Sequence, residues 1–217
     1  MSIIKFLFDF VLHIDVHLGQ IIATYGGLTY AILFGIIFME TGLVFTPFLP
    51  GDSLLFAAGA LAALGNLNVF FLAGLLFCAA LLGDTSNYFI GHFFGKKIVK
   101  HPIIPINEEH IKKTEEFFRK YGGKTIIMAR FIPIIRTFTP FVAGVGNMGY
   151  GKFISYCMVG AALWVSIATF SGYFFGNIPL VRKNFSLVIL IVILISLLPI
   201  IFQVVSKKLK KTKKIKE

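Results

Sequence analysis

Long apolar runs separated by short polar segments fill most of this chain. About 20 apolar residues are needed for a helix to cross the hydrocarbon core of a bilayer. The pattern predicts such helices over 20–39, 68–95, 150–176 and 186–206. Residues 1–18 instead place apolar and polar side chains on different sides of a helix, which predicts a short helix lying in the membrane interface. The sequence therefore predicts an all-α polytopic membrane protein with a single domain, 1–217.

One apolar segment carries charges and helix breakers that a plain span lacks. Glu40 and Asp52 lie in a run that is interrupted by Pro47, Pro50 and Gly51. In hydrocarbon, a charge or an interrupted backbone is unfavourable unless protein or a water-filled cavity covers it. Residues 41–66 are therefore predicted to form a re-entrant hairpin that lines a cavity. This hairpin belongs to a first half over 20–95.

A second segment repeats this pattern with charges of the opposite sign. Arg130 and Arg136 lie in an apolar run that is predicted to break at Pro133, Pro140 and Gly144. Residues 125–148 are predicted to form the second re-entrant hairpin, within a second half over 125–176. Because acids lie in one half and arginines in the other, we expect the two hairpins to meet.

The two segments also align in detail. Phe48-x-Pro50 is followed by Ala58-Gly59, and Phe131-x-Pro133 is followed by Ala143-Gly144; the next helices end in Gly91-His-Phe-Phe-Gly95 and Gly172-Tyr-Phe-Phe-Gly176. Broken apolar segments at corresponding places in two halves are typical of the binding site of a transporter.

Basic residues set the expected orientation in the membrane. The formal net charge is +11, but only 14% of the residues are charged, and the basic ones lie mainly in the loop 96–124 and the tail 207–217. Such clusters hold a segment in the cytoplasm and attract anionic lipid, so they do not indicate nucleic-acid binding. Both clusters lie on one side only if 125–148 does not cross the membrane. The two halves are then inverted, both termini are cytoplasmic, and the loop carries an amphipathic helix.

The predicted helix over 68–95 has a polar face. Asp84, Asn87 and Tyr88 have the spacing of one helix face. A polar contact between helices and a role in the transport pathway both explain this face, and both stay open. Cys78 and Cys157 lie in predicted spans and are expected to be buried without a disulfide.

Histidines give no sign of a metal site or of catalysis. His13 and His17 have the spacing of a metal pair, but no third ligand accompanies them. The remaining histidines do not form an arrangement of nucleophile and base. We therefore expect no metal, no cofactor and no enzymatic activity.

The motif residues resemble the DedA family of bacterial inner-membrane proteins over nearly the whole chain. The resemblance rests on Glu40-Thr-Gly-Leu, Pro47-Phe-Leu-Pro-Gly-Asp52, Gly83-Asp84, Gly122-Gly123-Lys124 and Arg130-Phe-Ile-Pro-Ile-Ile-Arg136-Thr-Phe-Thr-Pro140 with Ala143-Gly144. It implies two oppositely oriented re-entrant hairpins and a role in moving lipids such as undecaprenyl phosphate or phosphatidylethanolamine. It also implies a role in envelope integrity and in the proton motive force. By position, the embedded acids of the family match Glu40 and Asp52, and its basic pair matches Arg130 and Arg136.

The leading hypothesis is therefore a lipid translocase of the flippase or scramblase kind. Arg130 and Arg136 would hold a lipid phosphate, and Glu40 and Asp52 would neutralise the arginines or take up protons. Asp84 is expected to take part in transport or proton coupling. The expected partners are membrane lipids and protons, and a homo-oligomer stays open. A proton-coupled antiporter of small solutes or ions is the second hypothesis. A purely structural network of buried ion pairs is the third.

Overall fold

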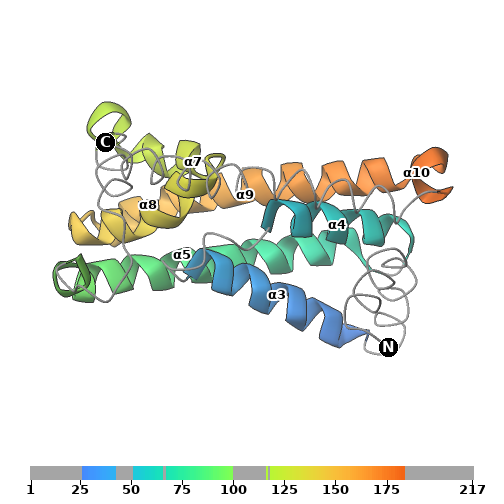
Figure 1. Ribbon diagram of the computed structural model, residues 1–217, viewed down its shortest axis with the longest axis horizontal. Helices are drawn as coiled ribbons and strands as arrows, with labels where there is room; N and C mark the ends of the chain where they lie inside the picture. Colours follow the sequence, from blue (N-terminus) through green and yellow to red (C-terminus); the bar gives the residue numbers. More distant parts are fainter. Residues whose placement is uncertain (1–25, 43–50, 66, 100–115, 117, 184–217) are drawn as a thin grey trace, which may run out of the picture.

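The computed structural model describes residues 26–42, 51–65, 67–99, 116 and 118–183 (Figure 1). The elements are α3 (Gly27–Gly42), α4 (Gly51–Ala63), α5 (Val69–Val99), η1 (Gly122–Lys124), α7 (Thr125–Ala129), α8 (Pro133–Val145), α9 (Tyr150–Gly176) and α10 (Pro179–Lys183). All regular elements of these described residues are helices, as the hydrophobic pattern predicts. In α5 and α9, the stretches Val69–Gly95 and Tyr150–Gly176 are each 27 residues long and apolar enough to cross a membrane.

The predicted boundaries hold well in the second half and less well in the first. The span over 150–176 coincides with α9, whereas the span over 68–95 continues to Val99. The start of the predicted loop 96–124 is thus helical, because lysine favours a helix and residues 96–99 contain neither glycine nor proline. Helix α3 likewise runs past Glu40 to Gly42. The predicted elements over 1–18, 186–206 and 207–217, and the breaks at Pro47 and Pro50, lie outside the described residues.

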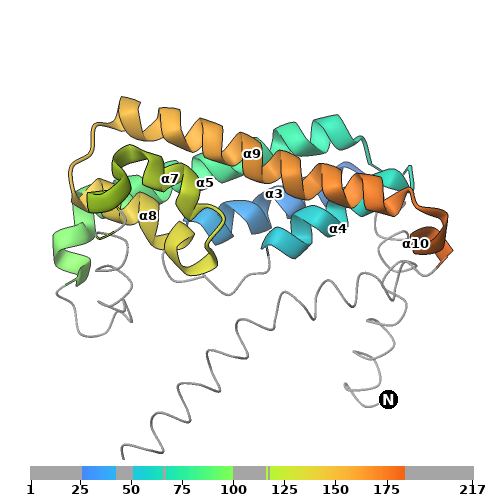
Figure 2. The same cartoon turned by 90° about the horizontal axis from the view of Figure 1, so that it is seen from above.

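The two long helices organise the molecule. Helices α5 and α9 run alongside each other, with α8 packed on α5 toward one end and α4 packed on α9 toward the other (Figures 1 and 2). Helix α3 packs along α5 on the α4 side. The C-terminal end of α3 and the N-terminal ends of α4 and α8 lie near the middle of the molecule (Figure 1). Three short helices therefore bring their ends to one central region.

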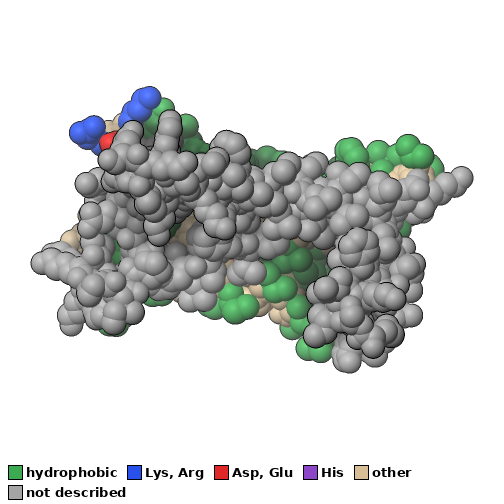
Figure 3. Space-filling model, in the orientation of Figure 1, with side chains coloured by type: hydrophobic (Ala, Val, Ile, Leu, Met, Phe, Trp, Pro, Cys, Tyr) green, Lys and Arg blue, Asp and Glu red, His purple; other side chains and the backbone are tan. Residues whose placement is uncertain are grey.

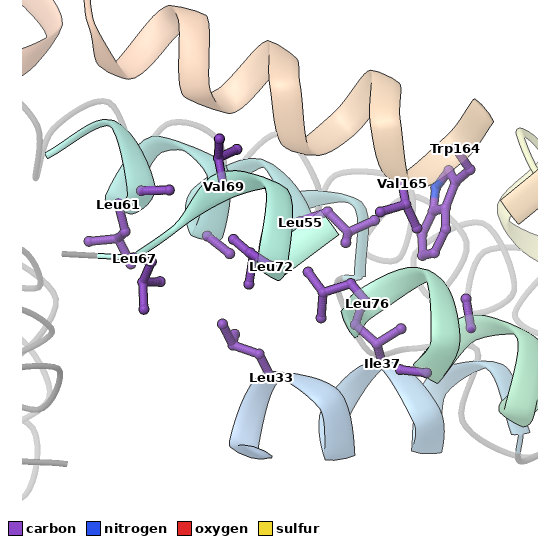
Figure 4. Packing of buried hydrophobic residues seen from close by; sticks show 14 of the residues in the cluster. Leu33, Ile37, Leu55, Leu61, Leu67, Val69, Leu72, Leu76, Trp164 and Val165 are labelled. Carbon is purple, nitrogen blue, oxygen red and sulfur yellow. The ribbon is translucent and has the colours of Figure 1, made fainter. Parts of the chain in front are cut away.

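An apolar core joins α3, α4, α5 and α9. Ile37, Leu55, Leu72 and Val165 are almost fully buried, and Figure 4 shows their side chains directed into the space between the four helices. Large apolar side chains also point outward, among them Phe70, which is 75% exposed. Figure 3 shows such apolar patches on the surface. An apolar interior and an apolar exterior together suit a lipid environment, where close packing holds helices together.

Glycines bring the short helices α4 and α8 into backbone contact with the long helices of the other half. The contacts are Gly59 on the Thr169 backbone and Gly172 on the Phe56 backbone, matched by Gly144 on the Tyr88 backbone and Gly91 on the Phe141 backbone. A Cβ atom at any of these positions would overlap the facing main chain. Small residues of this kind allow helices in membranes to approach closely. The motifs that align in sequence therefore make corresponding contacts, α4 on α9 and α8 on α5.

The two cysteines differ in their surroundings. Cys157 is buried as predicted, but Cys78 is exposed, so that prediction is wrong. The reason is the helix period: Ala79 and Ala80 face the core of the bundle, and Cys78 lies on the opposite side of α5.

Basic side chains gather at one end of the molecule. Arg119, Lys120 and Lys124 are exposed just before α7. Figure 3 shows Lys and Arg side chains at this end and apolar ones along the body. Within the described residues, this end therefore carries the charge expected of a region outside the membrane.

Candidate functional site

Five charged side chains from both halves meet in the middle of the molecule. They are Glu40 on α3, Asp52 on α4, Asp84 on α5, Arg130 directly after α7, and Arg136 on α8. Glu40 and Asp84 are each 3% exposed and Arg130 is 6% exposed. Buried charges are tolerated only when they are paired and hydrogen-bonded. The expectation that the acids of one half meet the arginines of the other agrees with these contacts.

Arg136 binds two carboxylates of the first half at once. Its Nη1 donates to Asp52 Oδ1 at 2.7 Å, and its Nη2 donates to Glu40 Oε1. The guanidinium has the planar fork needed for two such bonds. The Glu40 side chain is 3% exposed and that of Asp52 is 53% exposed. Arg136 therefore links an interior carboxylate with one that is open to the surroundings.

Helix ends position this cluster. Asp52 is in the first turn of α4, where the helix dipole favours an acid. Arg136 is in the first turn of α8, where the dipole disfavours a cation, so the two carboxylates compensate for its position. A Cβ atom on Gly51 would overlap the Glu40 carboxyl group. Gly51 is therefore required for α4 to begin directly against Glu40.

The prolines of α8 have different effects on the helix. Pro133 begins α8 and separates it from α7, so the turn at 130–132 places both arginines near helix ends. Helix α8, however, runs through Pro140 and Gly144 to Val145, and the predicted breaks at these two residues are wrong. A membrane helix tolerates proline where neighbours bind its backbone groups, and Asn87 Nδ2 binds the Thr137 carbonyl of the same turn at 2.9 Å. Gly144 serves packing instead.

Arg130 has a different partner from the one the sequence suggests. Its Nη1 donates to Asp84 Oδ2, not to Glu40 or Asp52. Arg130 Nε and Nη2 are buried and have no hydrogen-bond partner among the described residues. These two nitrogens form one edge of the guanidinium, which is the geometry that donates two hydrogen bonds to an oxyanion.

Trp164 on α9 contacts both ion-pair systems. Its Nε1 donates to Asp52 Oδ1 at 2.7 Å, and its ring centroid lies 5.2 Å from Arg130 Cζ and 5.3 Å from Arg136 Cζ. Guanidinium groups at this distance are attracted by the indole ring. Sequence reasoning missed this residue, since a tryptophan in an apolar span resembles an ordinary packing side chain. The one sequence signal for a special role was that Trp164 is the single tryptophan of the chain.

The polar face of α5 is buried, as its spacing predicts, but its residues have separate roles. Asp84 joins the charged cluster, whereas Asn87 Nδ2 binds the backbone carbonyls of Thr41 and Thr137. Tyr88 Oη donates to the Met148 carbonyl. Asn87 thus ties α5 to both α3 and α8, and Tyr88 ties α5 to the segment between α8 and α9.

Small cavities border the arginines. One has about 20 Å³ of room and is lined by Glu40, Thr41, Asp84, Arg130, Arg136, Thr137 and Trp164. A second, of about 10 Å³, is lined by Asp84, Ile126, Arg130, Arg136, Thr139 and Pro140. Each has room for roughly one water molecule. The site can therefore hold water, a proton or a small ion in this conformation, and a larger group requires movement of a side chain.

Comparison with known proteins places the chain in a family. A model of the VTT domain matches residues 49–174. Protein DedA of Escherichia coli K12 is 53% identical over 211 residues, 96% of each chain. Uncharacterized membrane protein Rv0364 of Mycobacterium tuberculosis H37Rv is 44% identical over 167 residues, covering 76% of this chain and 73% of the relative. Inner membrane protein YghB of E. coli K12 is 31% identical over 208 residues, 92% of each chain.

No solved structure matches the chain. The matched domain contains Asp52, Asp84, Arg130, Arg136 and Trp164, and the similarity to E. coli DedA extends over nearly the full length. The chain belongs to the DedA family of VTT-domain membrane proteins.

Proposed function

We propose that this protein is a lipid translocase that carries a phosphate-bearing lipid across the bacterial inner membrane. The observation that supports this most strongly is the arginine pair, buried Arg130 and mostly buried Arg136, which the acids of the opposite half hold at the centre of an apolar helix bundle. Undecaprenyl phosphate and phospholipids have the required combination of an oxyanion and long apolar chains. The proposed activity is transport, with no catalytic step and no cofactor.

Arginine suits a phosphate ligand in such surroundings. It stays charged when it is desolvated, and its nitrogens match phosphate oxygens in pairs. Arg130 offers two buried nitrogens without a hydrogen-bond partner in the described structure, and the residue lines a small cavity with Glu40 and Asp84. The lipid chains would remain among the apolar side chains outside the bundle while the headgroup passes the arginines.

The balance of charges suggests how protons enter this cycle. Three carboxyl groups, Glu40, Asp52 and Asp84, face two guanidinium groups. When all are ionised, the cluster is negative and repels an anionic headgroup. This repulsion is removed when a carboxyl group takes up a proton, or when a carboxylate moves away from its arginine. The proton gradient can therefore favour lipid binding on one side of the membrane.

The membrane topology is part of the proposal. We infer that α4 and the α7–α8 pair belong to re-entrant hairpins that enter from opposite sides, with both chain termini in the cytoplasm. The relative YghB is named an inner membrane protein, which supports a location in the inner membrane. Single cysteines placed in 102–110 and in 210–216 should both react with an impermeant maleimide only from the cytoplasmic side. Labelling of either from outside would contradict this topology.

A proton-coupled antiporter of small solutes or ions is the second candidate. The size of the cavity beside the arginines, about 20 Å³, favours it, because a lipid headgroup needs more room. The third candidate is a purely structural role, in which the charged cluster only stabilises the fold.

Reconstitution separates these functions. The purified protein is placed in liposomes with labelled undecaprenyl phosphate or labelled phosphatidylethanolamine, with and without a pH gradient. We expect one lipid to change leaflets faster than in protein-free liposomes, and expect Arg136→Gln to abolish the effect. Proton flux that follows an added solute, without lipid movement, would support the antiporter. No transport of either kind by folded protein would leave the structural role.

A further inference from the structure

One oxygen atom in the cluster accepts hydrogen bonds from two side chains of the other half. Asp52 Oδ1 lies 2.7 Å from Arg136 Nη1 and 2.7 Å from Trp164 Nε1. Asp52 comes from α4, whereas both donors belong to the second half, on α8 and α9. Two N–H groups directed at one charged oxygen are the arrangement that binds an oxyanion.

The acceptor is the most exposed member of this arrangement. The Asp52 side chain is 53% exposed, the Arg136 side chain is 13% exposed, and Trp164 is 4% exposed. The two donors are therefore fixed in the interior, while the carboxylate reaches them from a more open position. Of the three groups, Asp52 can leave with the smallest loss of packing.

An additional set of donors lies beside the same indole ring. Arg130 Cζ is 5.2 Å from the centroid of that ring, and Arg130 Nε and Nη2 are buried without a partner among the described residues. A carboxylate has two oxygens, but a phosphate has at least three to share between donors. A phosphate that replaced Asp52 could therefore bind Arg136 and Trp164 and still have oxygens for Arg130.

We propose that Arg136 and Trp164 form an oxyanion site for the phosphate of an anionic lipid, and that Asp52 occupies this site until the lipid displaces it. The inference rests on the proposed function and adds to it a ligand-binding residue, Trp164, and an inhibitory role for Asp52. While Asp52 is in place, three carboxyl groups face two arginines. Its departure removes one negative charge and exposes two donors in the same step.

The test measures binding of dodecyl phosphate to the full-length protein in a neutral detergent. Trp164 is the only tryptophan of the chain, so its fluorescence reports on the site directly. Inorganic phosphate tests a free oxyanion, and dodecanol controls for the alkyl chain. The variants are Asp52→Ala and the isosteric Asp52→Asn, with Glu116→Ala as a control in which an exposed carboxylate is lost elsewhere.

We expect both Asp52 variants to bind dodecyl phosphate more tightly than the wild type, by about tenfold for Asp52→Ala, because the competing carboxylate is gone. Glu116→Ala should bind like the wild type. Unchanged or weaker binding by folded Asp52 variants would overturn the inhibitory role, although lipid transport itself could stand. A failure of wild type and variants alike to bind dodecyl phosphate would instead overturn the proposed function. Tighter binding of inorganic phosphate than of dodecyl phosphate would overturn the lipid as the source of the oxyanion.

Trp164→Phe tests the donor itself. Phenylalanine keeps an aromatic ring beside both arginines and removes the N–H group. Its binding of dodecyl phosphate is read from the thermal stabilisation by the ligand, with the wild type measured in the same way. We expect affinity to fall about tenfold, which is the scale of one hydrogen bond to a charged group. Wild-type affinity in a folded Trp164→Phe protein would show that the indole N–H does not bind the ligand.

Discussion

The ends of the helix bundle and its centre follow different rules. At the ends, Gly59 with Gly172 and Gly144 with Gly91 make equivalent backbone contacts in the two halves. At the centre, the halves are unlike. The first half supplies all three acids of the cluster, and the second supplies both arginines and Trp164.

The difference has a physical cause. Close packing of helices depends on shape, so the same glycine pattern works in both halves of the chain. A buried charge depends on the sign of its neighbours, and two identical halves would bring like charges together. The halves can therefore share their packing residues, but their central charges must be complementary. Changes at the ends should affect stability alike in both halves, and changes at the centre should not.

The largest effect is expected at the most deeply buried acid. Asp84→Asn leaves the Arg130 guanidinium without its charged partner in the interior, where Asp84 is 3% exposed. We expect the free energy of unfolding to fall by about 3–5 kcal/mol. Denaturation in detergent micelles, followed by circular dichroism, measures this loss.

Asp52→Asn is the matched comparison, since it removes a carboxylate that is 53% exposed. Exposed ion pairs contribute only about 0.2–1 kcal/mol, so its loss should be several times smaller. Equal losses for Asp84→Asn and Asp52→Asn would show that burial does not distinguish the two acids.

The next prediction tests the equivalence of the ends. In Gly91→Ala and in Gly172→Ala, the new methyl group meets the backbone of Phe141 or of Phe56. We expect each change to lower the free energy of unfolding by about 1–3 kcal/mol, because overpacking forces the helices apart. The two losses should agree within the error of the measurement.

Gly35→Ala on α3 is the control, because a Cβ there meets nothing within 4 Å. It should be neutral, or should stabilise by up to about 1 kcal/mol through helix propensity. A loss confined to one of Gly91→Ala and Gly172→Ala would mean that the two ends are not equivalent.

The sequence predicts the ends of this molecule better than its centre. Helix α9 coincides with its predicted range because Gly149 and Asn177 bound a long apolar run. The meeting of Arg136 with Glu40 and Asp52 follows from opposite charges in two apolar segments of the chain. The partner of Arg130 is harder to predict, since it depends on how deeply α5 is placed beside α8.

The role of Trp164 and the unbroken helix at Pro140 could not be predicted from the sequence. Trp164 has no polar neighbour in sequence that marks it as a hydrogen-bond donor to Asp52. Pro140 is a helix breaker by composition, but the contact of Asn87 with the same turn comes from a distant helix. Both depend on tertiary contacts, which local patterns do not contain.

A change at the centre that keeps the charge should affect activity more than stability. Arg136→Lys retains the cation but loses the fork that binds Asp52 and Glu40 through separate nitrogens. We expect lipid transport in liposomes to fall about tenfold, equivalent to about 1.4 kcal/mol. Arg119→Lys, at an exposed position outside the cluster, is the control and should transport normally. Normal transport by Arg136→Lys would mean that only its charge matters.

The smallest expected effect is the energetic coupling between the halves, and it tests most directly whether they communicate at the centre. Arg136 and Asp52 are joined by a bond of 2.7 Å between groups of unequal exposure. The double-mutant cycle compares Asp52→Asn, Arg136→Gln and the double variant by their free energies of unfolding. We expect the double variant to lose less than the sum of the single losses, by about 0.5–1 kcal/mol, because contact with the surroundings screens the pair. The same cycle with Glu40→Gln in place of Asp52→Asn should give a larger coupling, since Glu40 is 3% exposed. Strict additivity in both cycles would show that the first-half acids and Arg136 act independently, and the exchange of acid for phosphate at Arg136 would then have no energetic basis.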